Sequence, residues 1–174
     1  MNEYKLHLGC SGKHLTDWTN IDIQPGKGVD MVMDVRALKF PDASASEIYY
    51  CHGLEHLRYA EVTPALKDWL RILVPGGLLR LAVPDFEAMA KLYANDTLCL
   101  DTFKWALSGG QENNWNIHYS LWDYKTLAEV LIGAGFVTVA RYEASDWLPN
   151  NFYDYSLFAL GGHLCSLNVI ARKR

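Results

Sequence analysis

The feature that most constrains the fold of this chain is an apolar run that ends in a glycine-bearing loop. Residues 6–12 read LHLGCSG, and a second apolar run, NIDI at 20–23, follows closely and contains an acid. Glycine has no Cβ, so the main chain of such a loop can approach a ligand closely. Asp22 is expected at the tip of the neighbouring strand, where a carboxylate can accept both hydroxyl groups of a ribose. The stretch therefore predicts a ligand that contains a nucleoside.

Short apolar runs alternate with turns and helical patterns in the first half of the chain. Such runs suit strands that are buried on both faces, as in a parallel sheet. They lie at residues 4–8, 18–23, 29–33, 47–51 and 78–83. A helix is expected before the fifth run, with Thr63 as its cap, Pro64 in its first turn and Pro75-Gly76-Gly77 as its stop. This alternation predicts an α/β sheet with right-handed crossovers.

The second half is less regular. Helices are expected at 86–94, at 99–108 and from Asp123 to Gly135, and strands at 136–142 and 166–172. The segments 86–122 and 143–163 are the expected substrate-side cover of a single domain that spans residues 1–174. The second of these is long and rich in aromatic residues, and connections of that kind are more often functional than plain turns.

Composition excludes several classes of protein. The 174 residues fit one domain, and a formal charge of −4 gives no basic footprint, so no nucleic-acid partner is expected. Cys10, Cys51, Cys99 and Cys165 form no CxxC pair, which argues against a zinc knuckle or a redox dithiol. No apolar run approaches the ~18 residues that span a bilayer, and the first strand leaves no room for a signal peptide. We expect a cytoplasmic protein without a membrane partner.

The glycine loop departs from the dinucleotide-binding pattern. Its spacing is G-x-x-G rather than G-x-G-x-x-G, and Asp22 comes ten residues after Gly12 instead of about 20. The first crossover is therefore at most a turn or so of helix, which is shorter than a normal βαβ connection. Taken alone, the loop is interpreted equally well as a plain tight turn.

The ordered set of motifs is more specific than the loop. It resembles the class I methyltransferases that depend on S-adenosylmethionine, most closely their small predicted members with a shortened first crossover. The motifs are LHLGCSG at 6–12, NID at 20–22, DV at 34–35, LEH at 54–56, LVPGGLL at 73–79, VPD at 83–85, AGF at 134–136 and SLNVIARK at 166–173. The fold that this resemblance implies is α/β and Rossmann-like: a seven-stranded, mostly parallel sheet with helices on both faces and an antiparallel last strand.

The resemblance also implies roles for particular positions. The loop from Leu8 to Gly12 would lie under the methionine part of the cofactor, and Asp22 would accept from the ribose hydroxyls. Asp34 would accept from the adenine amino group, with the backbone N–H of Val35 facing a ring nitrogen. The residues expected to bind S-adenosylmethionine are Leu8, Gly9, Cys10, Gly12, Asp22, Ile23, Asp34, Val35, Cys51 and His52.

The implied reaction is in-line transfer of a methyl group to an oxygen, nitrogen or carbon of a small-molecule acceptor. A hydroxyl acceptor needs a general base, and His52, His56 and His118 are the candidates because imidazole titrates near neutral pH. The identity of the acceptor is left open. Contacts between copies could help to close so small a domain, so a homo-oligomer is possible.

Two alternatives remain. Residues 52–56 spell H-x-x-E-H, a zinc-protease signature that requires His52, Glu55 and His56 on one helix. Gly53 interrupts that helix, so a zinc hydrolase is the weaker alternative and no metal is expected. The short first crossover favours the other alternative, a domain that binds the cofactor without catalysis.

Overall fold

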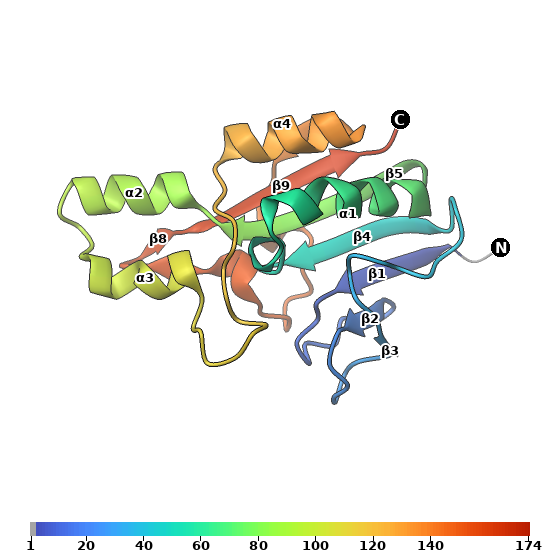
Figure 1. Ribbon diagram of the computed structural model, residues 1–174, viewed down its shortest axis with the longest axis horizontal. Helices are drawn as coiled ribbons and strands as arrows, with labels where there is room; N and C mark the ends of the chain where they lie inside the picture. Colours follow the sequence, from blue (N-terminus) through green and yellow to red (C-terminus); the bar gives the residue numbers. More distant parts are fainter. Residues whose placement is uncertain (1–2) are drawn as a thin grey trace.

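The computed structural model describes residues 3–174; Met1 and Asn2 lie outside the described part of the chain (Figure 1). Its centre is a seven-stranded sheet in the order β3-β2-β1-β4-β5-β9-β6. The strands β1 to β5 are parallel, and β9 runs antiparallel to both of its neighbours. The strand bounds are β1 Tyr4–Leu8, β2 Thr19–Asp22, β3 Met31–Val32, β4 Ala45–Cys51, β5 Leu73–Pro84, β6 Val137–Arg141 and β9 Ser166–Arg172. The expected mostly parallel sheet with an antiparallel last strand is confirmed.

Two helices, α1 (Tyr59–Ile72) and α4 (Tyr124–Ala134), lie on one face of the sheet (Figure 1). The apolar face of α1 carries Trp69, which is fully buried and donates its indole N–H to the Val35 carbonyl at 2.8 Å. The expected cap at Thr63 is wrong. The helix begins at Tyr59, because Glu61 accepts the backbone N–H of Arg58 at 2.9 Å and so caps the helix one turn earlier.

The opposite face of the sheet is covered differently, although helices were expected on both faces. The connections β1–β2 and β2–β3 hold no helix in the part of the chain described, because each is shorter than the dozen or so residues that a helical crossover needs. Aromatic residues of the segment before β9 cover this face instead. Trp147 packs edge-on against the fully buried Tyr49 of β4, with ring centroids 4.7 Å apart. Between residues 143 and 158 the regular structure of this segment is two short 3₁₀ turns, η2 (Ala144–Asp146) and η3 (Tyr155–Leu157).

A smaller lobe lies beyond the carboxyl end of β5 (Figure 1). It consists of α2 (Phe86–Ala94), α3 (Leu100–Ser108) and a short ribbon of β7 (Ala159–Leu160) and β8 (His163–Leu164). Met89, Phe103 and Cys165 are buried in its own apolar cluster. The lobe therefore lies next to the edge of the sheet that is formed by the carboxyl ends of the parallel strands, and its own two-stranded ribbon is separate from that sheet.

No helix in the described residues is both long enough and apolar enough to cross a membrane.

Candidate functional site

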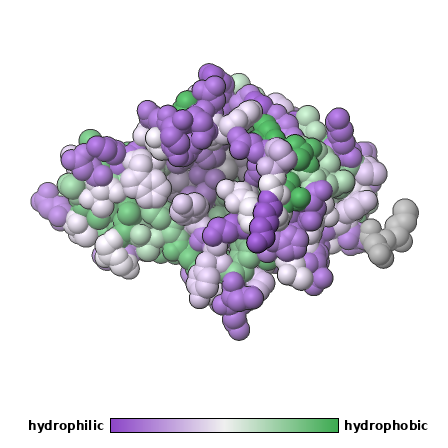
Figure 2. Space-filling view, turned by 90° about the horizontal axis from the view of Figure 1, so that it is seen from below, coloured by the Kyte–Doolittle hydropathy of each residue, from purple (hydrophilic) through white to green (hydrophobic). Residues whose placement is uncertain are grey.

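A cavity of about 840 Å³ opens at the carboxyl ends of β1, β2 and β4. Figure 2 looks onto this side of the molecule, where the surface is hollowed near its middle. Open α/β sheets bind ligands at this edge, beside the point where the strand order reverses. Of the residues expected to act in binding or catalysis, the cavity is lined by Gly9, Asp22, Ile23, Asp34, Val35, Cys51, His52, His56 and His118.

The turn after β1 brings main chain to the cavity wall. Gly9 has φ +56°, and a Cβ at this position would lie 2.7 Å from the ring of Tyr50, so no larger residue fits here without a shift. Ser11, which the sequence reasoning did not select, lines the cavity beside it.

Three residues expected in the cofactor loop do not line the main cavity. Leu8 is fully buried in the core, and Cys10 lines an adjoining cavity of about 310 Å³. Gly12 lines neither cavity; its φ of +73° allows the chain to turn. These positions shape the loop rather than face the main cavity.

Asp22 is held rigidly at the end of β2. The backbone N–H of Ser11 donates to its Oδ2 at 2.8 Å, and the N–H of Gln24 donates to its Oδ1 at 3.0 Å. Each carboxylate oxygen has two acceptor sites, so both oxygens can still accept a hydroxyl from a ligand. Ile23 lies beside it on the cavity wall.

Asp34 is already paired, which the sequence reasoning missed. The Arg36 guanidinium donates to both Asp34 oxygens, from Nη2 at 2.6 Å and from Nε at 2.9 and 3.1 Å, and the backbone N–H of Arg36 donates to Oδ1. The hydrogen bond with the Arg36 side chain lowers the pKa of Asp34. Arg36 also bridges to Glu61 at 2.9 Å. The carboxylate has little acceptor capacity left for an adenine amino group.

Cys51 and His52 form the tip of β4. Burial raises the pKa of the Cys51 thiol well above its ordinary value, so the thiol is neutral. His52 has φ +47°, and burial lowers its pKa to about 3. Its Nε2 lies 3.1 Å from Ser166 Oγ, whose single O–H donates to Asn168 Oδ1. His52 must therefore donate here, and its Nε2 has no free lone pair with which to act as a base.

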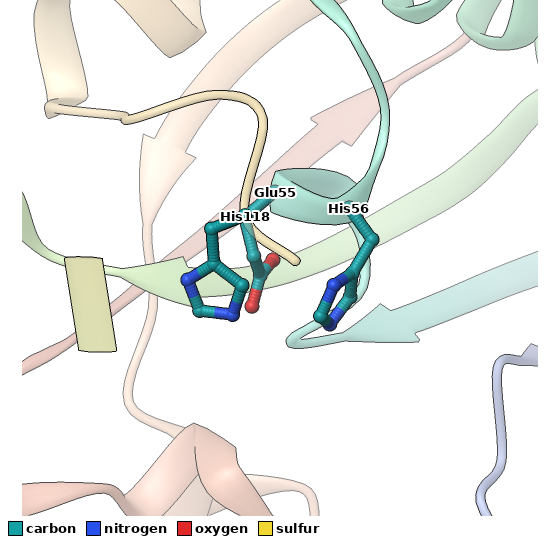
Figure 3. A group of neighbouring side chains, drawn as sticks. All are labelled: Glu55, His56 and His118. Carbon is teal, nitrogen blue, oxygen red and sulfur yellow. The ribbon is translucent and has the colours of Figure 1, made fainter. Parts of the chain in front are cut away.

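His56 and His118 meet across the cavity with their rings 4.8 Å apart, centroid to centroid. Figure 3 shows both rings beside Glu55: Glu55 and His56 come from the 3₁₀ turn η1 (Leu54–His56), and His118 comes from the loop between α3 and α4. Burial is the main cause that lowers the pKa of His118, to about 4, with His56 adding to the shift; burial also lowers the pKa of His56. Both rings are therefore neutral at pH 7.

The arrangement expected for the zinc-hydrolase alternative is not formed. His52 ends β4 with a positive φ, and η1 begins only at Leu54, so His52 and His56 do not share one helical face. Glu55 and His56 instead lie close to His118, with one ligand-type atom of each within 4.8 Å of the others.

The far wall of the cavity comes from the second half of the chain. Trp105 of α3, Trp115 and His118 of the following loop, and Tyr155 and Phe158 beside η3 all line it. The role of 86–122 and 143–163 as a cover stays a prediction. Trp122, which follows this loop, is buried in the main core instead.

Comparison with known proteins agrees with this geometry. Residues 6–81 match the family model described as a methyltransferase domain. No curated protein matches the chain in sequence. An S-adenosylmethionine-dependent methyltransferase from Methanosarcina mazei is 19% identical with a TM-score of 0.60, and the match covers 99% of this chain and 93% of that one.

Two further solved structures are similar. One is an S-adenosylmethionine-dependent methyltransferase of Thermotoga maritima, a possible histamine N-methyltransferase (14% identity, TM-score 0.63, 98% of this chain and 82% of that one). The other is the 1,6-didemethyltoxoflavin-N1-methyltransferase of Burkholderia thailandensis with bound 1,6-didemethyltoxoflavin and S-adenosylhomocysteine (18% identity, TM-score 0.58, 98% and 72%). The resemblance in the sequence is thus confirmed: residues 6–81 match the methyltransferase-domain family model, and the whole chain shares the fold of these S-adenosylmethionine-dependent methyltransferases.

Proposed function

We propose that this protein transfers a methyl group from S-adenosylmethionine to a small-molecule acceptor. The observation that carries the proposal is the position of Asp22. Its carboxylate is fixed by two backbone N–H groups at the wall of a cavity that also contains the neutral imidazoles of His56 and His118. A hydroxyl-binding carboxylate and a set of proton acceptors therefore share one site.

The residues of the cavity fit the methyl donor. A volume of about 840 Å³ lies within the range of cavities that bind small ligands and cofactors. Gly9 lets the ligand approach the main chain closely, Asp22 would accept from the ribose hydroxyls, and Val35 would line the adenine. When bound, S-adenosylmethionine supplies an electrophilic methyl group on a sulfonium.

The chain's own residues would orient the reaction and exclude water from it. Cys51 and His52 would flank the methyl group as neutral side chains. Neither would then compete as an anion with the acceptor for the methyl group. His56 and His118 would accept the proton of a hydroxyl acceptor. Their Nδ1 atoms lie 3.1 and 3.0 Å from main-chain carbonyls, so Nδ1 carries the hydrogen and Nε2 keeps a lone pair.

Calorimetric titration with S-adenosylhomocysteine tests the binding step. We expect saturable binding to the wild type and at least tenfold weaker binding to Asp22→Asn, which loses a charged acceptor. Asp17→Asn is the matched control, because Asp17 is exposed, lines neither cavity, and has a φ of +64° that asparagine tolerates. Thermal unfolding of both variants separates lost binding from lost folding. Absence of binding to the folded wild type would contradict the proposal.

Turnover distinguishes an enzyme from a domain that only binds the cofactor. Formation of S-adenosylhomocysteine in the presence of a panel of alcohols, phenols and amines is expected for at least one acceptor class. Binding without turnover on every class would favour the non-catalytic alternative. All four cysteines are free, which supports a reducing, cytoplasmic location for this activity.

A further inference from the structure

Three side chains on the wall of the main cavity form a cluster, and one of them, Glu55, has no part in the methyl transfer proposed above. Glu55, His56 and His118 lie side by side (Figure 3), and each offers one ligand-type atom within 4.8 Å of the other two. All three residues line the main cavity. The cluster is therefore reachable by a small ion from solvent.

The two imidazoles are oriented as metal-binding histidines usually are. The Nδ1–H of His56 donates to the carbonyl of Ile117 at 3.1 Å, and the Nδ1–H of His118 donates to the carbonyl of Ala106 at 3.0 Å. Metal-bound histidines almost always donate their second ring N–H in this way, which fixes the tautomer and the ring. The Nε2 lone pairs of both rings are left available to an ion.

Glu55 provides a second, independent observation. Only 2% of the residue is exposed, and its Oε2 has no hydrogen-bond partner among residues 3–174. Its other oxygen lies 3.7 Å from His52 Nδ1, beyond hydrogen-bond distance. A buried polar atom without a partner is unfavourable, and a bound cation would supply the missing interaction.

The donor set selects the class of ion. Two imidazole nitrogens and one carboxylate oxygen suit zinc, iron(II), cobalt(II) or manganese(II), whereas magnesium and calcium prefer ligand sets made of oxygen. Zinc–ligand bonds of about 2.1 Å in tetrahedral geometry place the ligand atoms about 3.4 Å apart. The largest separation, 4.8 Å, would therefore have to shorten by about 1.4 Å, which rotations about the χ angles of the three side chains would provide.

We propose that Glu55, His56 and His118 bind one divalent transition-metal ion and leave its remaining positions open to the cavity. The identity of the acceptor in this inference rests on the proposed function: an open position beside the methyl donor suits an acceptor that binds through an oxygen, such as an alcohol, a phenol or a carboxylate. In the transfer, the acceptor oxygen forms the bond to the methyl carbon. The sulfur keeps the electron pair of the broken bond. Because the ion would occupy the Nε2 lone pairs of His56 and His118, a hydroxyl acceptor would release its proton to water in the metal-bound protein rather than to these rings.

The test uses Co²⁺ and Zn²⁺ alone, on untagged protein first treated with a chelator. We expect one equivalent of Co²⁺ to bind with a visible absorption spectrum of a nitrogen-ligated site, and one equivalent of Zn²⁺ by calorimetry. Glu55→Gln and His118→Ala are each expected to weaken the binding of both ions by at least tenfold. His163→Ala is the control, because His163 is an exposed histidine outside the cavity.

Circular dichroism and thermal unfolding show whether each variant is folded, and His118→Gln replaces His118→Ala if the latter is not. Absence of stoichiometric Co²⁺ and Zn²⁺ binding to the wild type would overturn the inference. Binding that is unchanged in the folded Glu55 and His118 variants would overturn it as well. Neither titration contains S-adenosylhomocysteine, so a failure here is distinct from a failure of methyl-donor binding.

Discussion

At the scale of single residues, burial determines which side chains are charged. His7 on β1 is 2% exposed, stacks on Tyr49 with centroids 5.4 Å apart, and lies 2.9 Å from Asn20 through Nδ1. Desolvation by burial lowers its pKa from the ordinary value of 6.5. The folded chain therefore keeps His7 neutral at a pH where the unfolded chain protonates it.

This difference makes stability depend on pH. The pKa of His7 is lower in the folded state, so its contribution is present above about pH 6.5 and is lost as the pH falls below that value. We expect His7→Gln to flatten the acid side of the stability curve by up to about 1.4 kcal/mol per pH unit. Urea unfolding of both proteins between pH 5 and 8 measures the slopes. Equal slopes would show that His7 is not kept neutral; His163→Gln should match the wild type.

At the scale of the elements, two glycines at the end of α4 are expected to respond oppositely to alanine. Gly133 is helical with open space where a Cβ would stand, so Gly133→Ala should stabilise by about 0.5–1 kcal/mol. Gly135 has φ +112°, and a Cβ there would lie 2.8 Å from Leu70, so Gly135→Ala should destabilise by at least about 1 kcal/mol. Denaturant midpoints compare the pair, and a shift of the same sign in both would contradict this account of the helix end.

A part-buried hydrogen bond helps to hold the aromatic cover on the second face of the sheet. Tyr49 donates its O–H to Asp154 Oδ2 at 2.6 Å, and Asp154 Oδ1 accepts from the N–H and O–H of Ser156. Tyr49→Phe leaves the carboxylate without this donor, at a cost of about 1–3 kcal/mol. We expect faster amide hydrogen exchange in 144–157, with β4 and β5 still protected. Tyr153→Phe, on an exposed ring of the same segment, should leave exchange unchanged.

At the scale of the whole molecule, the sheet could be predicted from the sequence, whereas the loops and side-chain contacts that surround the cavity could not. Most strands follow from buried apolar runs, whereas the edge strand β3 leaves Met31 and Val32 exposed, contrary to the expectation for the run at 29–33. The position of Asp22 follows from its place at a strand end. The meeting of Glu55 with His118 depends on the loop before α4 returning to η1, where the N–H groups of Tyr119 and Ser120 reach the Glu55 carbonyl at 2.8 and 3.2 Å. The pairing of Asp34 with Arg36 depends on a rotamer choice. Neither arrangement leaves a periodic signal in the sequence.

Ligand binding should stabilise the whole domain. The cavity joins the ends of β1, β2 and β4 to the loop before α4 and to η3, so an occupant contacts elements from both halves of the chain. A ligand that binds only the folded state stabilises it by about 2.7 kcal/mol at a hundredfold excess over its Kd. We expect S-adenosylhomocysteine to raise the unfolding temperature of the wild type and of Asp17→Asn, and to raise that of Asp22→Asn much less. Equal shifts in all three would place the ligand elsewhere.

The central claim is that this cavity binds the methyl donor through Asp22, and a crystal structure with S-adenosylhomocysteine tests it most directly. The account predicts the ligand at the carboxyl ends of β1, β2 and β4, with its ribose hydroxyls in hydrogen-bond contact with the Asp22 carboxylate. A ligand bound outside this cavity, or a cavity that stays empty at a saturating ligand concentration, would contradict it.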